Sequence, residues 1–272
     1  MERPSLIRLF RRLRRGAAAI TLPPAALLVV LAPVVCRAQG EASGSQTKKS
    51  EVTYGAELDI NSRYLWRGLA LTDGPVIQPS VWVSKSGFTL TLWGNLSLSD
   101  EAEQKRLSEI IPIITYSREW KKLTIEPSVT FYFTRPLSPA VDPPTGEASI
   151  RFSYPVGPVG LFTDQNIDFI SYRGAYFGDA GISYERELSR KASLAGAITT
   201  GWGSSKFNNV YIGEPKKSFN FAGAELSFQY SITRSLRLRP HFEFAYTVDS
   251  RLRSRLETPT LVNAGIALTV SF

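Results

Sequence analysis

The C-terminal stretch Val262-Asn263-Ala264-Gly265-Ile266-Ala267-Leu268-Thr269-Val270-Ser271-Phe272 decides the fold. Every second residue from Val262 to Phe272 is apolar, and the residues between them are small or polar. Successive side chains of a β-strand point to opposite faces, so this stretch predicts a strand with one apolar and one polar face.

The same period of two recurs along the chain and predicts twelve strands. Their connections alternate between short ones, such as Ser86-Gly87, and longer ones, such as residues 204–216. This alternation of loop lengths is typical of transmembrane β-barrels. The predicted strands cover residues 52–60, 77–83, 88–98, 110–116, 123–133, 150–154, 159–169, 180–184, 194–198, 222–230, 236–244 and 262–272.

Residues 52–272 are therefore predicted to form an all-β fold, an antiparallel up-and-down transmembrane barrel of about 12 strands. After residue 38 no apolar run approaches the ~20 residues that a spanning helix needs. An even number of strands returns the chain to the side on which it began, so both termini are expected in the periplasm. A soluble β-sandwich also alternates along its strands, but it has no reason to alternate its loop lengths.

Residues 1–38 are predicted to be a signal peptide that is cleaved after export. Five arginines between Arg8 and Arg15 precede an apolar run from Gly16 to Val35, and Cys36-Arg37-Ala38 ends it with small residues around a spacer. A lipoprotein signal anchored at Cys36 and a twin-arginine signal at Arg11-Arg12 are the alternatives. Residues 39–51 are polar and predict a flexible periplasmic lead-in.

Charge and cysteine content exclude several functions. Removing the signal takes away seven of the 32 basic residues and one of the 24 acidic ones, which leaves 25 against 23. A nearly neutral mature chain gives no support to nucleic-acid binding. The single cysteine also leaves with the signal, so disulfides, thiolate metal sites and a cysteine nucleophile are excluded.

One hairpin resembles a known family. The residues Asn61-Ser62-Arg63-Tyr64-Leu65-Trp66-Arg67-Gly68, followed by Leu71-Thr72-Asp73-Gly74-Pro75 and Gln78-Pro79-Ser80, resemble the first hairpin of the TorF-like porins. The resemblance implies an exported outer-membrane barrel, and it brings no catalytic residue. The terminal Phe272 is similar to the final aromatic residue that the barrel assembly machinery reads, which makes that machinery an expected partner.

Charged residues at polar-face positions are expected to line the lumen, because an Arg or Lys facing lipid at mid-depth costs roughly 2–4 kcal/mol. One hypothesis is a solute-selecting constriction in which Arg63 and Arg67 face Asp164 and Asp168 across the barrel. The other is that these charges pair with neighbouring strands and fill the interior. The candidate pore-lining residues are Arg63, Arg67, Glu126, Asp164, Asp168, Glu225, Arg237, Arg239, His241 and Glu243.

The function predicted is a passive or weakly selective channel for small hydrophilic solutes, without cofactor or metal and monomeric by default. A plugged barrel with a structural or surface-interaction role is the alternative. His241, the only histidine, is expected to face Ser227 or Glu225. The Ser227 contact would suit an outer-membrane hydrolase, whereas a hydrogen bond to Glu225 would make His241 a structural lumen residue.

Overall fold

The fold was analysed in a computed structural model, which describes residues 51–72, 74–98, 106–134 and 143–272. The predicted signal peptide, residues 39–50 of the lead-in and Asp73 lie outside the described residues. The elements are β1 (Thr53–Asn61), β2 (Leu65–Trp66), β3 (Leu69–Ala70), β4 (Val76–Lys85), β5 (Phe88–Ser97), β6 (Arg106–Tyr116), β7 (Arg118–Trp120), β8 (Leu123–Thr134), β9 (Thr145–Val156), β10 (Val159–Asp168), β11 (Tyr176–Ser189), β12 (Ala192–Gly203), α2 (Ser205–Tyr211), β13 (Ser218–Ser231), β14 (Leu236–Thr247), α3 (Ser250–Arg253) and β15 (Thr260–Ser271).

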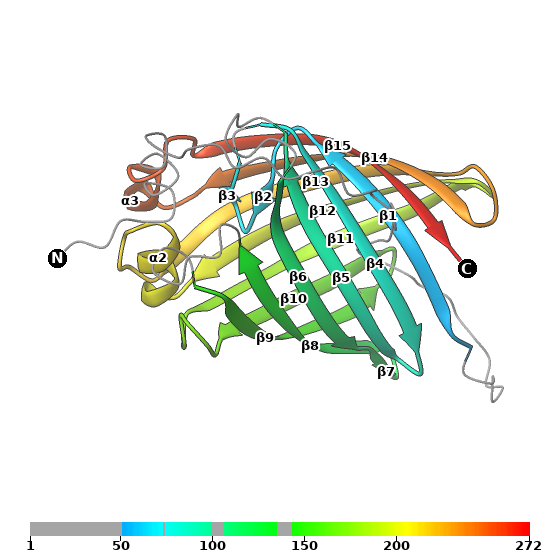
Figure 1. The fold of residues 1–272 in the computed structure, drawn as a ribbon, viewed down its shortest axis with the longest axis horizontal. Coiled ribbons are helices and arrows are strands. Elements are labelled where there is room, and N and C mark those ends of the chain that lie inside the picture. Colours follow the sequence, from blue (N-terminus) through cyan, green and yellow to red (C-terminus); the bar gives the residue numbers. More distant parts are fainter. Residues whose placement is uncertain (1–50, 73, 99–105, 135–142) are drawn as a thin grey trace, which may run out of the picture.

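Twelve antiparallel strands close into a barrel, as predicted from the sequence (Figure 1). β1 pairs with β4 on one side and with β15, the last strand, on the other. Pairing of β6 with β8 completes the ring, and the short β7 continues the edge of β6 along β8. Closure gives each of these described barrel strands a neighbour on both sides, which a barrel in lipid requires.

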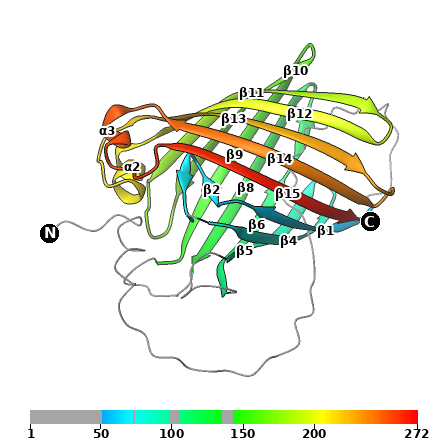
Figure 2. The ribbon, with the colours of Figure 1, turned by 90° about the horizontal axis from the view of Figure 1, so that it is seen from above.

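The two ends of the barrel differ in their connections. Short turns join strands at one end, here called the turn end, and the Ser86-Gly87 turn has positive φ at both residues, as a two-residue hairpin requires. The opposite end, here called the loop end, carries β2, β3, α2 and α3 (Figures 1 and 2). The alternation of loop lengths seen in the sequence thus corresponds to two different ends.

The outer surface of the barrel is apolar. Outward residues such as Leu90, Ile198 and Phe244 are exposed, and Ile198 is 70% accessible. This exposure would be unfavourable in water, but lipid chains cover such a surface without cost. No helix among the described residues is long and apolar enough to span a membrane.

Several elements are longer than the sequence predicts, or were not predicted at all. β9, β11 and β12 each extend at both ends beyond their alternating apolar cores, because residues that do not keep the apolar alternation still continue the ladder. The helices α2 and α3 lie in connections that were predicted as loops. Each begins at a capping side chain, Ser204 and Asp249, which accepts hydrogen bonds from main-chain N–H groups of the first turn.

Candidate functional site: the lumen and its inward loop

The inner wall of the barrel is acidic. Inward positions follow from the strand registers, which place charged side chains opposite one another on the face away from the apolar exterior. Among the side chains that the structure describes, the inward strand positions and the inward loop carry more carboxylates than guanidinium groups. The carboxylates include those of Glu57, Asp59, Glu109, Glu126, Glu147, Asp164, Asp168, Asp179, Glu185, Glu187, Glu225 and Glu243, and the guanidinium groups include those of Arg63, Arg67, Arg151, Arg237 and Arg239.

The loop between β1 and β4 folds back as a small hairpin. Its strands β2 and β3 pair through Trp66 and Leu69, so that the turn consists of Arg67 and Gly68 alone. Both turn residues have positive φ, 52° for Arg67 and 75° for Gly68. Gly68 accepts this conformation freely, whereas the left-handed conformation of Arg67 costs about 1–2 kcal/mol. Contacts of the Arg67 side chain must offset that strain.

This hairpin crosses the lumen from one wall to the other. At its base, Ser62 hydrogen-bonds to Asn263 of β15, and the ring of Tyr64 packs against Trp93 of β5. At its tip, Gly68 lies so close to Phe221 of β13 that a Cβ atom built on the glycine would be 2.6 Å from the Cβ atom of Phe221. Because β5 and β13 belong to different walls of the ring, the hairpin spans the interior.

Arg67 is held at the far wall by a buried ion pair. Its guanidinium donates two hydrogen bonds to the carboxylate of Glu147 on β9, at 2.8 and 2.7 Å. The hydroxyl of Tyr132 donates to the same carboxylate at 2.8 Å. The guanidinium also lies over the rings of Trp66 and Phe177, at 4.5 and 4.9 Å from their centroids. Such bidentate and cation–π contacts suit arginine and not lysine.

Aromatic and aliphatic side chains from three loops pack around the hairpin. Phe207 of α2 is fully buried against Phe177, with ring centroids 4.8 Å apart. Leu69 of the hairpin packs with Ile212 and with Leu252 of α3. The loop end of the lumen is therefore filled by side chains from the β1–β4, β12–β13 and β14–β15 connections.

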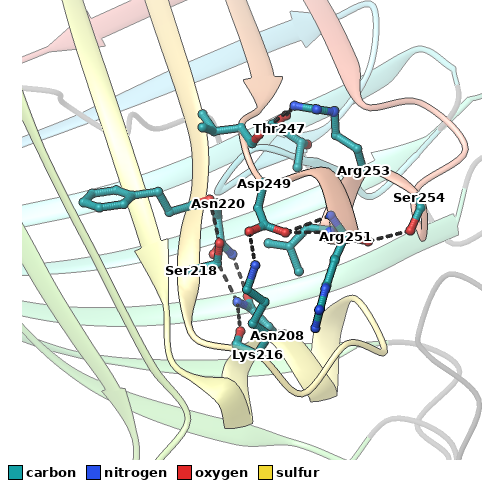
Figure 3. A network of polar contacts seen from close by, with 12 residues as sticks. Asn208, Lys216, Ser218, Asn220, Thr247, Asp249, Arg251, Arg253 and Ser254 are labelled. Atoms are coloured by element: carbon teal, nitrogen blue, oxygen red, sulfur yellow. Dashed lines mark hydrogen bonds and ion pairs between the residues drawn. The ribbon is translucent and has the colours of Figure 1, made fainter.

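Polar contacts join the two helical connections to each other (Figure 3). Asp249 caps α3 through Arg251 and Leu252, and it accepts a hydrogen bond from Lys216 at 2.5 Å. This Lys216 contact, together with the main-chain caps, holds the pKa of Asp249 well below its usual range. Asn208 of α2 donates to the carbonyl oxygen of Lys216. Together these contacts join α2, Lys216 and α3 into one polar network, here called the cover of the loop end.

A second polar network lies on the inner face of β1, β15 and β14. His241 Nε2 is 3.0 Å from a carboxylate oxygen of Asp59, two strands away. Between them β15 presents Gly265, where an added Cβ would lie 2.4 Å from His241 Nε2. In the next layer, Arg239 binds Glu57 at 3.2 Å. The small residues of β15 thus let side chains from β1 and β14 meet.

His241 is therefore placed differently from the sequence expectation. The register does put it opposite Ser227, but its hydrogen bond goes to Asp59 and not to Glu225. The expectation considered only neighbouring strands, and the glycine between β14 and β1 allows a longer reach. A hydrogen bond between Ser227 and His241 is absent from the contacts of the described residues.

The opposition of Arg63 and Arg67 to Asp164 and Asp168 across the barrel stays a prediction, and the direct partners of these side chains are other residues. Arg67 binds Glu147, and Asp164 binds Arg151 on the neighbouring strand β9 at 2.7 Å. Asp168 accepts hydrogen bonds from Thr145 and from the main-chain N–H groups of Ile170 and Tyr172. The prediction placed Arg67 on the wall, whereas its loop carries it across the lumen.

The strand registers and hydrogen bonds give the positions of the remaining candidates. Glu126 is opposite Arg151 in the register of β8 and β9, and Glu225 is opposite Glu243 in that of β13 and β14. Arg237 hydrogen-bonds to Ser271 near the turn end. The main-chain N–H of Arg63 donates to Asn263.

Glu147 is the residue that sequence reasoning missed. It precedes the predicted strand 150–154, because Gly146 and Ala148 on the outward face are too small to register as an apolar alternation. The sequence Glu147, Ser149, Arg151 does keep the polar period of two. Following that polar period backwards would have found it.

No family model and no curated protein sequence matches the chain. Its structure is similar to that of the KdgM porin, with a TM-score of 0.51 and 9% identity, over 81% of this chain and 99% of that one. It is also similar to the NanC porin, with a TM-score of 0.50 and 12% identity, over 79% and 98%. The fold is that of an outer-membrane porin barrel.

Proposed function

We propose that this protein is an outer-membrane channel for small hydrophilic solutes, whose passage is narrowed by the inward hairpin β2–β3. The observation that carries the proposal is a polar inner wall beneath an apolar exterior, crossed by a loop bound to the far wall through Arg67 and Glu147. The loop end faces outward and both termini are periplasmic. The protein acts as a channel and not as an enzyme.

The resemblance of residues 61–80 to the TorF-like porins belongs to the same proposal. In that hairpin, Trp66, Arg67 and Gly68 are the residues that reach the far wall. Their place in the quoted pattern has a physical reason, since the turn needs a glycine and the far wall offers a carboxylate and aromatic rings.

A plugged, structural barrel is the second candidate, and the packed loop end favours it. Single-channel recording separates the two. The signal-free protein is refolded, checked for a heat-dependent band shift in a denaturing gel, and inserted into planar bilayers beside a Trp66→Ala/Arg67→Ala variant. A channel gives small steady openings for the native protein and larger ones for the variant.

The matched control is Arg173→Ala, an exposed arginine of the loop end outside the lumen, and its conductance should equal that of the native protein. Folded barrels that never open, in both the native protein and the Trp66→Ala/Arg67→Ala variant, would contradict the channel and support the plugged barrel.

A further inference from the structure

The charges of the inner wall are not balanced by its ion pairs. Three guanidinium groups lie within 4.0 Å of lumen carboxylates. These ion pairs are Arg67 with Glu147, Arg151 with Asp164, and Arg239 with Glu57. Among the described side chains, the other inward carboxylates include Glu126, Asp179, Glu185, Glu225 and Glu243, against two further guanidinium groups, Arg63 and Arg237, while His241 contacts both Asp59 and Glu243.

Two pairs of carboxylates face each other directly on neighbouring strands. Glu225 lies opposite Glu243 in the register of β13 and β14, and Asp164 lies opposite Asp179 in that of β10 and β11. Like charges in directly opposed positions of a sheet repel and cost stability. Arg151 compensates only the second pair, through Asp164.

The Glu225 and Glu243 pair is open to the lumen. Glu225 is exposed, and the side chain of Glu243 is 37% accessible. Nδ1 of the His241 ring lies 4.0 Å from the carboxylate of Glu243, and Nε2 of the same ring contacts Asp59. The position next to Glu225 on β12 is Ala197, which brings no charge. A cation in the lumen would therefore relieve this repulsion.

We infer that the lumen selects for small cationic solutes, such as alkali cations, organic ammonium ions and basic amino acids, over anions of the same size. This inference rests on the proposed channel function. The carboxylate excess is spread over strands on both sides of the barrel, so it acts on the whole passage and not at one point. A narrow path with low-dielectric walls concentrates ions of the opposite sign to its lining.

The test is the reversal potential of the refolded protein in a tenfold gradient of potassium chloride. We expect K⁺ to be favoured over Cl⁻, and a Glu225→Gln/Glu243→Gln variant to lower that permeability ratio by about twofold or more. Glu225→Asp/Glu243→Asp, which keeps both charges, should restore the preference. Lysine should enter protein-containing liposomes faster than glutamate.

The outcomes separate the two proposals. Openings without preference, or with preference for Cl⁻, overturn the cationic selectivity and leave the channel intact. A folded barrel without any openings overturns the channel and the selectivity together. An equal permeability ratio in the native protein and the Glu225→Gln/Glu243→Gln variant would overturn the assignment of the cation selectivity to Glu225 and Glu243.

Discussion

The loop end and the turn end of the lumen are built on opposite principles. The largest fully buried side chains all lie toward the loop end, namely Val76, Asn95, Asp168, Phe177, Phe207, Asn208, Leu252 and Leu261. Toward the turn end, inward residues such as Glu185 and Ser231 are exposed or only half-buried. The loop end is packed like the core of a soluble domain, whereas the inner wall at the turn end is open to water.

The difference shows where the rigidity of the barrel is placed. At the loop end, three connections bury aromatic rings and one ion pair, so a substitution there leaves a cavity or an unpaired charge. At the turn end, water can replace a lost side chain. Substitutions should therefore have large effects near Arg67 and small ones near the turns.

The largest effect is expected from Glu147→Gln, which leaves Arg67 buried without its counter-charge. Breaking a buried ion pair by removing one partner costs about 3 kcal/mol or more. Urea unfolding of the reconstituted barrel, followed by tryptophan fluorescence, gives the free energy of unfolding. Glu126→Gln on the neighbouring strand β8 is the control, with an expected loss within ~0.5 kcal/mol. Equal losses in the two variants would contradict the special role of the Arg67 pair.

Gly265→Val should have the next largest effect, because the position lies between β1 and β14. A Cβ atom there would be 2.3 Å from Asn61 Oδ1 and 2.4 Å from His241 Nε2. Overpacking of this kind costs about 1–3 kcal/mol, measured by the same urea unfolding. Ala264→Val, on the exposed apolar face one residue away, should be nearly neutral. If both variants unfold alike, the network across Gly265 is not rigid.

Asp249→Asn is expected to loosen only the cover of the loop end. Because the Lys216 contact lowers the pKa of Asp249 in the folded protein, its contribution is present above the ordinary aspartate pKa and lost as pH falls through the folded value. Hydrogen exchange of residues 248–257 should be faster in the variant at pH 7, by about 0.5 kcal/mol of protection, because Asn keeps the cap and loses only the charge pair with Lys216. The difference between the two proteins should shrink in strong acid, and a difference independent of pH would contradict the ion pair.

Ser227→Ala should have the smallest effect. Ser227 is half-buried on the wall opposite His241, and His241 is bound to Asp59. We expect a change in unfolding free energy within ~0.5 kcal/mol and no change in phospholipid hydrolysis relative to the native protein. Loss of a measurable lipase activity in this variant would revive the hydrolase hypothesis.

The same contrast explains what the sequence could reveal. Periodicity predicted twelve strands and their closure, because each strand carries its own alternation of faces. It did not predict that Arg67 would meet Glu147 of β9, since the path of a loop depends on what the far wall offers. His241 shows the same limit, because its reach to Asp59 depends on Gly265, a residue of a third strand.

The central claim is that the tip of the β2–β3 hairpin lies against β13 inside the lumen, and a disulfide cross-link tests it most directly. The substitutions Gly68→Cys and Phe221→Cys are introduced together into the signal-free chain, which has no cysteine of its own. The two Cβ atoms would need to move apart only slightly to reach disulfide geometry, about 3.5–4.5 Å. Mild oxidation of the folded barrel should give a disulfide-linked pair of peptides that cover positions 68 and 221, detected by mass spectrometry. A folded barrel that leaves both introduced thiols free would show that the tip of the hairpin does not lie against β13.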